Sequence, residues 1–249
     1  IKKNKEDLLL IIVPKNASIS GVLTKSLSCS SAVNFCKNNL KSKNKKVRAI
    51  LVNSGNSNAF TGIKGEKCVR TILSYLSKKL NCTEEEIYTA STGVIGEFLD
   101  PGIIITALKK NEPSSINSWP EAAKSIMTTD TFHKVFYETC YINESLINIV
   151  GIAKGSGMIA PNMATMLSFI FTDANISSNV LQKILANENE KTFNSITVDS
   201  DTSTSDTVLL TSTNTKNHKK IINFNDPDLN QFKNALFNLM LNLAKQIVT

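Results

Sequence analysis

KGSGMIAPNMATML, residues Lys154 to Leu167, is a glycine-rich stretch between two patterns that are typical of β-structure. Before it, residues 135–142 and 146–153 are predicted strands joined by a short polar turn, which is the pattern of a β-hairpin. After it, residues 166–171 have the composition of a further strand. The stretch therefore connects an antiparallel pair of strands to another strand.

Further from this stretch, predicted strands and helices are interspersed along the chain. Strands are predicted at residues 7–13, 47–53 and 206–211, and helices at residues 69–80, after Pro101, at residues 120–125 and near residues 180–185. Residues 54–65 and 91–96 are predicted loops. Because helices alternate with strands while a hairpin is also present, the sequence predicts an α/β fold with mixed sheets layered with helices.

The clearest helix pattern closes the sequence. Asp226 can cap a helix, and Pro227 suits its first position, where no backbone N–H is needed. One apolar stripe follows at helical spacing, made by Leu229, Phe232, Leu236, Leu239, Met240, Leu243 and Ile247. We therefore predict a helix that begins at Pro227 and packs along this stripe.

Composition narrows the function classes. The 249 residues are 41% hydrophobic, which is enough for a core, and carry a formal net charge of +7. The basic run from Lys41 to Arg48 lacks aromatic residues, so we interpret it as a solvated loop before a strand. Arg48 and Arg70 are the only arginines, which argues against a nucleic-acid partner. An acidic membrane surface and small acidic substrates remain as possible partners of the positive charge.

The cysteines indicate a reducing compartment. There are five of them, without CxxC spacing, so neither a disulfide framework nor a zinc site is predicted. No signal peptide and no apolar run of about 18 residues is present, so we expect a cytoplasmic protein without a membrane partner. The sequence starts at Ile1 without Met and ends at Thr249 directly after a helix pattern, and we expect a fragment truncated at both ends.

The residues required for several common types of catalytic or binding site are missing from this sequence. Only His133 and His218 are present, both in polar contexts, so a Ser-His-Asp or Cys-His arrangement is disfavoured. No GxxxxGK[ST] or GxGxxG motif is present to bind phosphates. The TxxE pattern from Thr83 to Glu86 is interpreted as a capping box rather than as a catalytic carboxylate.

Threonine next to small residues remains as a candidate nucleophile. A threonine hydroxyl needs a base, and a chain cut before the threonine supplies one as the free α-amine, with a pKa of roughly 7.7 to 8.0. Ala164-Thr165 offers a small residue before such a cut. Lys154 offers a cation to anchor a substrate, and Thr92-Gly93 offers donors for an oxyanion. A self-cleaving site also needs a flexible or strained segment before the cut, and Gly155, Gly157 and Pro161 would shape that segment. Taken alone, these residues are better explained as a glycine-rich loop that leads into a strand.

Five blocks in the sequence resemble the glutamate N-acetyltransferase / ornithine acetyltransferase family of arginine biosynthesis. They are VNSGNSNAFTG (52–62), STGVIGE (91–97), MTTDTF (127–132), KGSGMIAPNMATML (154–167) and, more weakly, VDSDTSTSDTVLL (198–210). The resemblance runs through essentially the whole chain. It implies one acyltransferase unit over residues 1–249, with the terminal-nucleophile architecture of the ornithine acetyltransferases.

The resemblance also implies a reaction. Self-cleavage between Ala164 and Thr165 would give residues 1–164 and 165–249, which stay together in a heterotetramer of two cleaved pairs, with the cut at the start of a central strand. Acetyl would pass from N-acetylornithine to glutamate through acetyl-Thr165, without a metal or other cofactor. Whether acetyl-coenzyme A also serves as a co-substrate stays open.

The resemblance assigns roles to particular residues. Thr92 and Gly93 would form the oxyanion hole, while Thr128, Lys154 and Thr165 would bind substrate. Ser200 and Ser205 stand where the family usually has Gly and Asn.

Two further departures from the family concern the substrate pocket. Phe60 replaces a smaller residue, and further binding residues of the family would lie beyond Thr249.

Two alternatives to the acetyltransferase remain open. One is an amidase or aminopeptidase on the same self-cleaving fold, and the other is an inactive truncated fragment or a basic binding protein.

Overall fold

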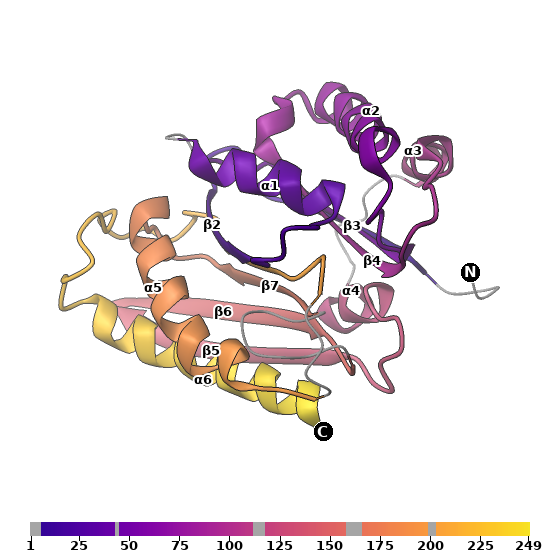
Figure 1. The fold of residues 1–249 in the computed structure, drawn as a ribbon. Helices are drawn as coiled ribbons and strands as arrows, with labels where there is room; N and C mark the ends of the chain where they lie inside the picture. Colours follow the sequence, from indigo (N-terminus) through magenta and orange to yellow (C-terminus); the bar gives the residue numbers. More distant parts are fainter. Residues whose placement is uncertain (1–5, 43–44, 112–117, 158–165, 199–202) are drawn as a thin grey trace.

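Two β-sheets lie face to face, with helices on both outer faces (Figure 1). The structure is a computed structural model, and it describes residues 6–42, 45–111, 118–157, 166–198 and 203–249. The mixed, layered α/β architecture predicted from the sequence is confirmed.

The smaller sheet has the strand order β1-β3-β4. Its strands are β1 (Leu8–Ile12), β3 (Ala49–Asn56) and β4 (Ile87–Val94). β1 pairs with β3 antiparallel, and β3 pairs with β4 parallel. Helices α1 (Ser31–Lys41), α2 (Gly62–Leu80) and α3 (Pro101–Lys110) lie on its outer side (Figure 1).

The larger sheet has the strand order β2-β8-β7-β6-β5. Its strands are β2 (Ser18–Leu23), β8 (Thr207–Ser212), β7 (Leu167–Thr172), β6 (Ser145–Lys154) and β5 (Lys134–Ile142). Among the four strand pairs that the structure describes in this sheet, β7 with β8 is parallel and the other three are antiparallel. Helices α5 (Ser178–Lys191) and α6 (Leu229–Val248) cover its outer face, and α4 (Trp119–Ser125) lies beside β5 and β6 (Figure 1).

The apolar run of β7 is explained by burial on both faces. Leu167, Phe169 and Phe171 belong to the core between the two sheets, whereas Ile170 belongs to the core under α5 and α6. Successive side chains of a strand point to opposite faces, so a strand buried on both sides is apolar along most of its length. The one polar residue between Leu167 and Phe171, Ser168, donates its hydroxyl to the carbonyl of Ile152. The central position of β7 follows from this run.

Close packing brings α6 onto β6. A Cβ atom added at Gly151 would lie 2.7 Å from both Leu239 Cδ2 and Leu243 Cδ1. All seven residues of the predicted apolar stripe are buried, which confirms the helix and its face. Its predicted start at Pro227 is wrong, because the helix begins at Leu229. The Asp226 carboxylate accepts the N–H of Asp228 in a turn before the helix.

Other predicted elements differ from the structure in informative ways. The hairpin, the helices after Pro101 and around residue 120, and the interaction of the Glu86 carboxylate with the N–H of Thr83 are confirmed. The predicted loop at residues 91–96 is wrong in its first half, since β4 continues to Val94. Its short polar residues are held by the ladder to β3. β2 and α1 were not predicted, because neither has a strong apolar pattern.

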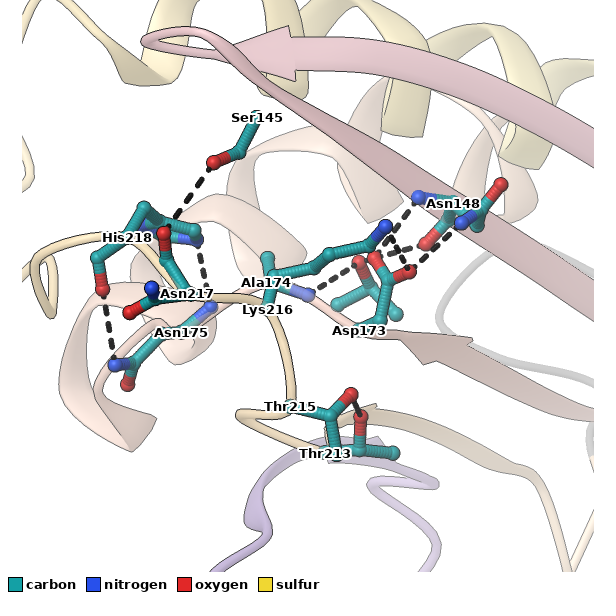
Figure 2. A network of polar contacts seen from close by, with 11 residues as sticks. Ser145, Asn148, Asp173, Ala174, Asn175, Thr213, Thr215, Lys216, Asn217 and His218 are labelled. Atoms are coloured by element: carbon teal, nitrogen blue, oxygen red, sulfur yellow. Dashed lines mark hydrogen bonds and ion pairs between the residues drawn. The ribbon is translucent and has the colours of Figure 1, made fainter.

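A polar network closes the end of the larger sheet where β6 starts and β7 ends (Figure 2). Asn148 donates from its backbone and side-chain nitrogens to Asp173, at 2.9 and 2.7 Å, and Lys216 Nζ lies 3.7 Å from the same carboxylate. His218 Nε2 accepts the N–H of Asn175 at 2.9 Å. These contacts order the connection after β8 at the end of the sheet remote from Lys154.

Candidate functional site

Lys154 and Thr92 meet between the two sheets. Lys154 is the last residue of β6, Thr92 lies near the end of β4, and each is only 2% exposed. Lys154 Nζ donates to Thr92 Oγ1 at 3.2 Å. In β4, Tyr88 and Ala90 belong to the core between the sheets, so Thr92 shares their face by strand alternation. The structure thus brings together two of the residues predicted from the sequence.

Gly93 is required by a close backbone approach. Its φ is +126°, and a Cβ atom there would lie 2.3 Å from the carbonyl carbon of Gly55 in β3. Gly55 itself has a φ of +105°. Only glycine fits such a position without strain. Gly93 is exposed although Thr92 is buried, so this strand end borders solvent.

Asp130 links Thr128 to the end of β6. The Asp130 carboxylate accepts the N–H of Thr128 at 3.2 Å, the N–H of Gly155 at 2.7 Å and Lys134 Nζ at 2.8 Å. Burial would raise the pKa of this carboxyl, but the hydrogen bonds from Lys134 and Gly155 and the charge of Lys154 outweigh burial and lower the pKa. Thr128 is therefore joined to the Lys154–Gly155 segment through an ionised carboxylate.

A second acidic residue, Asp206, lies where β7 begins. Its Oδ1 accepts the N–H of Met166 at 2.9 Å, and the residue is fully buried. Burial raises the pKa of Asp206 to about 8, although the hydrogen bonds from Met166 and Ser203 and the charge of Lys154 act in the opposite direction. This carboxyl is the one most strongly perturbed near the predicted nucleophile.

Ala164, Thr165, Pro161 and Ser200 lie outside the described residues. The cleavage point and the nucleophile therefore stay predictions. The described residues on either side, Lys154 to Gly157 and Met166, run into and out of the segment that carries them. The roles assigned to Thr92, Gly93, Thr128 and Lys154 also stay predictions.

Asp130 and Asp206 are not among the site residues predicted from the sequence. Both lie inside blocks that resemble the family, MTTDTF and VDSDTSTSDTVLL, and this position could have marked them as candidates. Their hydrogen bonds could not be predicted, because their partners Gly155 and Met166 are 25 and 40 residues away along the chain. Only the folded structure joins them.

The two departures that the structure describes have different consequences. Ser205 is buried, and its N–H donates to Ser203 Oγ at 3.0 Å. Phe60 has a φ of +57° and a side chain that is 66% exposed. A bulky side chain in the left-handed region is strained, and a smaller residue would relieve that strain.

The described residues hold no group of three or more His, Cys, Asp or Glu that could bind a metal ion. Within the same part of the chain, no helix is long and apolar enough to cross a membrane. His218 belongs to the network at the far end of the sheet (Figure 2), where it accepts a backbone N–H. A structural role explains it.

Helices, two facing sheets and helices form a layered fold that this chain shares with proteins of the Ntn hydrolase fold class. The structure of l-aminopeptidase d-ala-esterase/amidase from Ochrobactrum anthropi, a variant of that fold, matches 99% of this chain and 80% of its own, with a TM-score of 0.53. The two sequences are 9% identical, so this likeness concerns the fold alone.

Within this class, the chain belongs to the ArgJ family, whose model matches residues 1–249. The arginine biosynthesis bifunctional protein ArgJ of Brucella suis is 46% identical over 99% of this chain, and that of Agrobacterium fabrum is 47% identical. The chain spans 60% of the length of these relatives. The crystal structure of the Bacillus halodurans protein of the same name matches 66% of this chain and 85% of its own, with 30% identity and a TM-score of 0.58.

Proposed function

We propose that the complete protein is a self-cleaving acetyltransferase that moves acetyl from N-acetylornithine to glutamate, with Thr165 as the nucleophile. Membership of the ArgJ family, whose relatives are named for arginine biosynthesis, supports the substrate class. The observation that carries the proposal is the buried Lys154–Thr92 contact beside the strand that follows Thr165.

The proposed reaction has two balanced halves. The free α-amine of Thr165 accepts the proton of Oγ1, which attacks the acetyl carbonyl carbon. The carbon–nitrogen bond breaks, the nitrogen takes the proton, and ornithine leaves. The amine of glutamate then attacks the ester carbonyl of acetyl-Thr165, and Oγ1 recovers its proton as N-acetylglutamate departs. Dividing the transfer into two displacements replaces one difficult step by two easier ones.

The geometry at Thr92 suits an oxyanion donor. A lysine ammonium can only donate hydrogen bonds, so Thr92 Oγ1 accepts from Lys154 through a lone pair. The hydroxyl hydrogen of Thr92 is then directed to another acceptor. In a buried site, such a donor stabilises developing negative charge more strongly than it would in water.

Lys154 and Thr128 would hold the substrate. A buried ammonium pairs with a carboxylate as a point charge, and both proposed substrates carry an α-carboxylate. The Asp130 carboxylate fixes the backbone of Thr128 and Gly155 together, so both would approach the same substrate. The scheme requires no metal and no coenzyme.

After cleavage, the two products would stay associated because their strands interleave. β2, β5 and β6 precede Thr165 in the chain, while β7 and β8 follow it. In the sheet, β8 lies beside β2 and β7 lies beside β6. The later segment is thus hydrogen-bonded to the earlier one along two strand edges. A dimer of such cleaved pairs would give the heterotetramer that the family resemblance implies.

Acetyl transfer tests the proposal directly. The complete protein, purified and incubated with N-acetylornithine, should release ornithine and, with glutamate, form N-acetylglutamate. A denaturing gel should show two bands, and mass spectrometry should locate the cut after Ala164. Thr165→Ala should leave one band and no transfer. Wild-type protein that stays uncut and still transfers acetyl would contradict the mechanism.

The same assay separates the alternatives. Release of ornithine at a rate independent of glutamate would indicate the amidase or aminopeptidase instead. An uncut protein that forms no acetyl-enzyme would indicate an inactive fragment or a binding protein. Replacing N-acetylornithine by acetyl-coenzyme A tests whether the enzyme accepts a second donor, as the word bifunctional in the relatives' names suggests.

A further inference from the structure

The backbone N–H and carbonyl of Met166 are both hydrogen-bonded, to Asp206 just before β8 and to Thr207, the first residue of β8. Asp206 Oδ1 accepts the Met166 N–H at 2.9 Å, and the Thr207 N–H donates to the Met166 carbonyl at 3.1 Å. The second contact belongs to the parallel pairing of β7 with β8, whereas the first replaces a backbone acceptor by a carboxylate. The Asp206 carboxylate therefore adds one side-chain hydrogen bond just before the first backbone pair of β7 and β8.

The Met166 N–H belongs to the peptide bond that joins Met166 to Thr165. A peptide unit is planar, so its N–H, its carbonyl group and the preceding Cα atom keep fixed relative positions. A hydrogen bond to this N–H consequently restrains the unit that includes the Cα atom of Thr165. This restraint follows from covalent geometry.

Asp206 is a costly residue for this position if its purpose is stability. The residue is fully buried, and its Oδ2 has no hydrogen-bond partner among the residues that the structure describes. A buried polar atom without a partner lowers the stability of the folded state. Burial also raises the pKa of the carboxyl to about 8. Costs of this kind concentrate at functional sites, where a group is kept for its chemistry or its position.

We propose that Asp206 is a positioning residue for Thr165: its carboxyl holds the amide of Met166 and thereby fixes the peptide unit that presents the nucleophile to the Thr92–Gly93 site. The inference rests on the proposed role of Thr165 as the nucleophile. Its structural part, that Asp206 restrains the Met166 amide, is independent of that role.

Asp206→Leu and Asp206→Asn form the test, in the complete protein. Leucine has a similar size but no acceptor, whereas asparagine keeps an oxygen for the Met166 N–H. The first measurement is amide exchange after selective labelling with ¹⁵N-methionine, which leaves few signals, because residues 1–249 contain five methionines. The second is single-turnover formation of acetyl-enzyme in the cleaved fraction, in which the amplitude reports competent enzyme and the rate constant reports positioning.

We expect Asp206→Leu to speed exchange of the Met166 amide at least about tenfold and to slow acetylation by roughly tenfold to a hundredfold, with KM little changed, because small misplacements of a nucleophile are expensive. Asp206→Asn should stay within about threefold of wild type in both measurements. Thr211→Val is the matched control. Thr211 is also buried in β8 with a hydroxyl that lacks a described partner, but it lies at the opposite end of the strand.

An unchanged acetylation rate constant in Asp206→Leu would overturn the inference, and so would a loss of amplitude alone, which a purely structural role predicts. If the leucine variant does not fold, Asp206→Ser takes its place. The smaller serine leaves space for water, and its hydroxyl is too short to replace the carboxyl as the acceptor of the Met166 N–H. Absence of acetylation in wild-type protein would contradict the proposed function instead. The exchange measurement would then still decide whether Asp206 holds the Met166 amide.

Discussion

At the scale of single residues, the site depends on buried polar groups whose partners come from different strands. Lys154 and Thr92 are 62 positions apart in the chain, and their contact places a fixed positive charge beside a hydroxyl group. Neither side chain is placed by its own helix or strand alone. The position of each side chain depends on strands from both sheets. Single substitutions can test the role of each residue.

Thr92→Val removes the hydroxyl and keeps the shape of the side chain. If Thr92 donates to the oxyanion, the rate constant of acetyl-enzyme formation should fall by about 10²–10³, the loss that follows removal of one such donor. Thr92→Ser should recover much of the rate. Thr89→Val, in the same strand but on its opposite face, is the control and should leave the rate unchanged. A Thr92→Val enzyme within threefold of wild type would exclude this role.

Phe60 gives a prediction about stability. Glycine adopts its φ of +57° without strain, while an L-residue in this region costs about 1–2 kcal/mol. After subtraction of the extra chain entropy of glycine, Phe60→Gly should raise the free energy of unfolding by roughly 0.5 kcal/mol. Chemical denaturation measures it. Phe98→Gly is the control, an exposed phenylalanine without positive φ, and it should not stabilise the protein.

At the scale of elements, the paired ends of β3 and β4 are the most tightly specified part of the site. Their register brings Gly55 opposite Gly93, and a β-bulge follows at Asn56. The close approach of the two backbones leaves no room for a side chain at Gly93, whereas Gly55 is favoured by its φ of +105°. The position of Thr92 therefore depends on two glycines as well as on Lys154.

Gly93→Ala should be far more damaging than Gly96→Ala. The first would put a Cβ atom 2.3 Å from the carbonyl carbon of Gly55, whereas at Gly96, with a φ of +84°, nothing lies within 4 Å. We expect Gly93→Ala to lower the free energy of unfolding by about 3 kcal/mol or more, because rigid backbone must move. Gly96→Ala should cost about 1–2 kcal/mol, from backbone strain alone. Equal losses in denaturation experiments would show that the strand ends separate easily.

The elements also show what sequence patterns can predict. α6 and β7 were predictable because apolar periodicity or a continuous apolar run reflects burial directly. β4 was partly missed because Ser91, Thr92 and Gly93 are small and are held by strand pairing rather than by apolar burial. The predicted site residues came from motifs, whereas Asp130 and Asp206 needed the fold, since their hydrogen bonds join separate segments.

At the scale of the whole molecule, two buried carboxyls give stability opposite dependences on pH. The pKa of Asp130 is lower in the folded protein than in the unfolded chain, so its contribution is present above the unfolded pKa and disappears as pH falls through the folded one. The pKa of Asp206 is raised from 3.8 to about 8, so the folded state binds a proton there that the unfolded chain releases. The contribution of Asp206 to stability therefore decreases as pH rises between these two values.

Asp206→Asn should remove the second dependence. Between pH 5 and 7.5, the variant should gain stability relative to wild type by up to about 1.4 kcal/mol per pH unit, the linkage slope for one proton. Chemical denaturation of both proteins across this range measures the difference. A difference that is constant with pH would show that Asp206 is ionised in the folded protein.

The strand order has a consequence for how an active enzyme can be produced. β7 and β8 lie next to each other between β2 and β6, so residues 165–249 contribute a contiguous pair of strands to a sheet that residues 1–164 otherwise build. Fragment complementation should therefore succeed. Two separate translation products, the second one beginning with threonine after its initiator methionine is removed, should assemble into the mature arrangement. The covalent link between the two segments would then not be required for assembly, and the terminal amine would arise without any autoproteolysis.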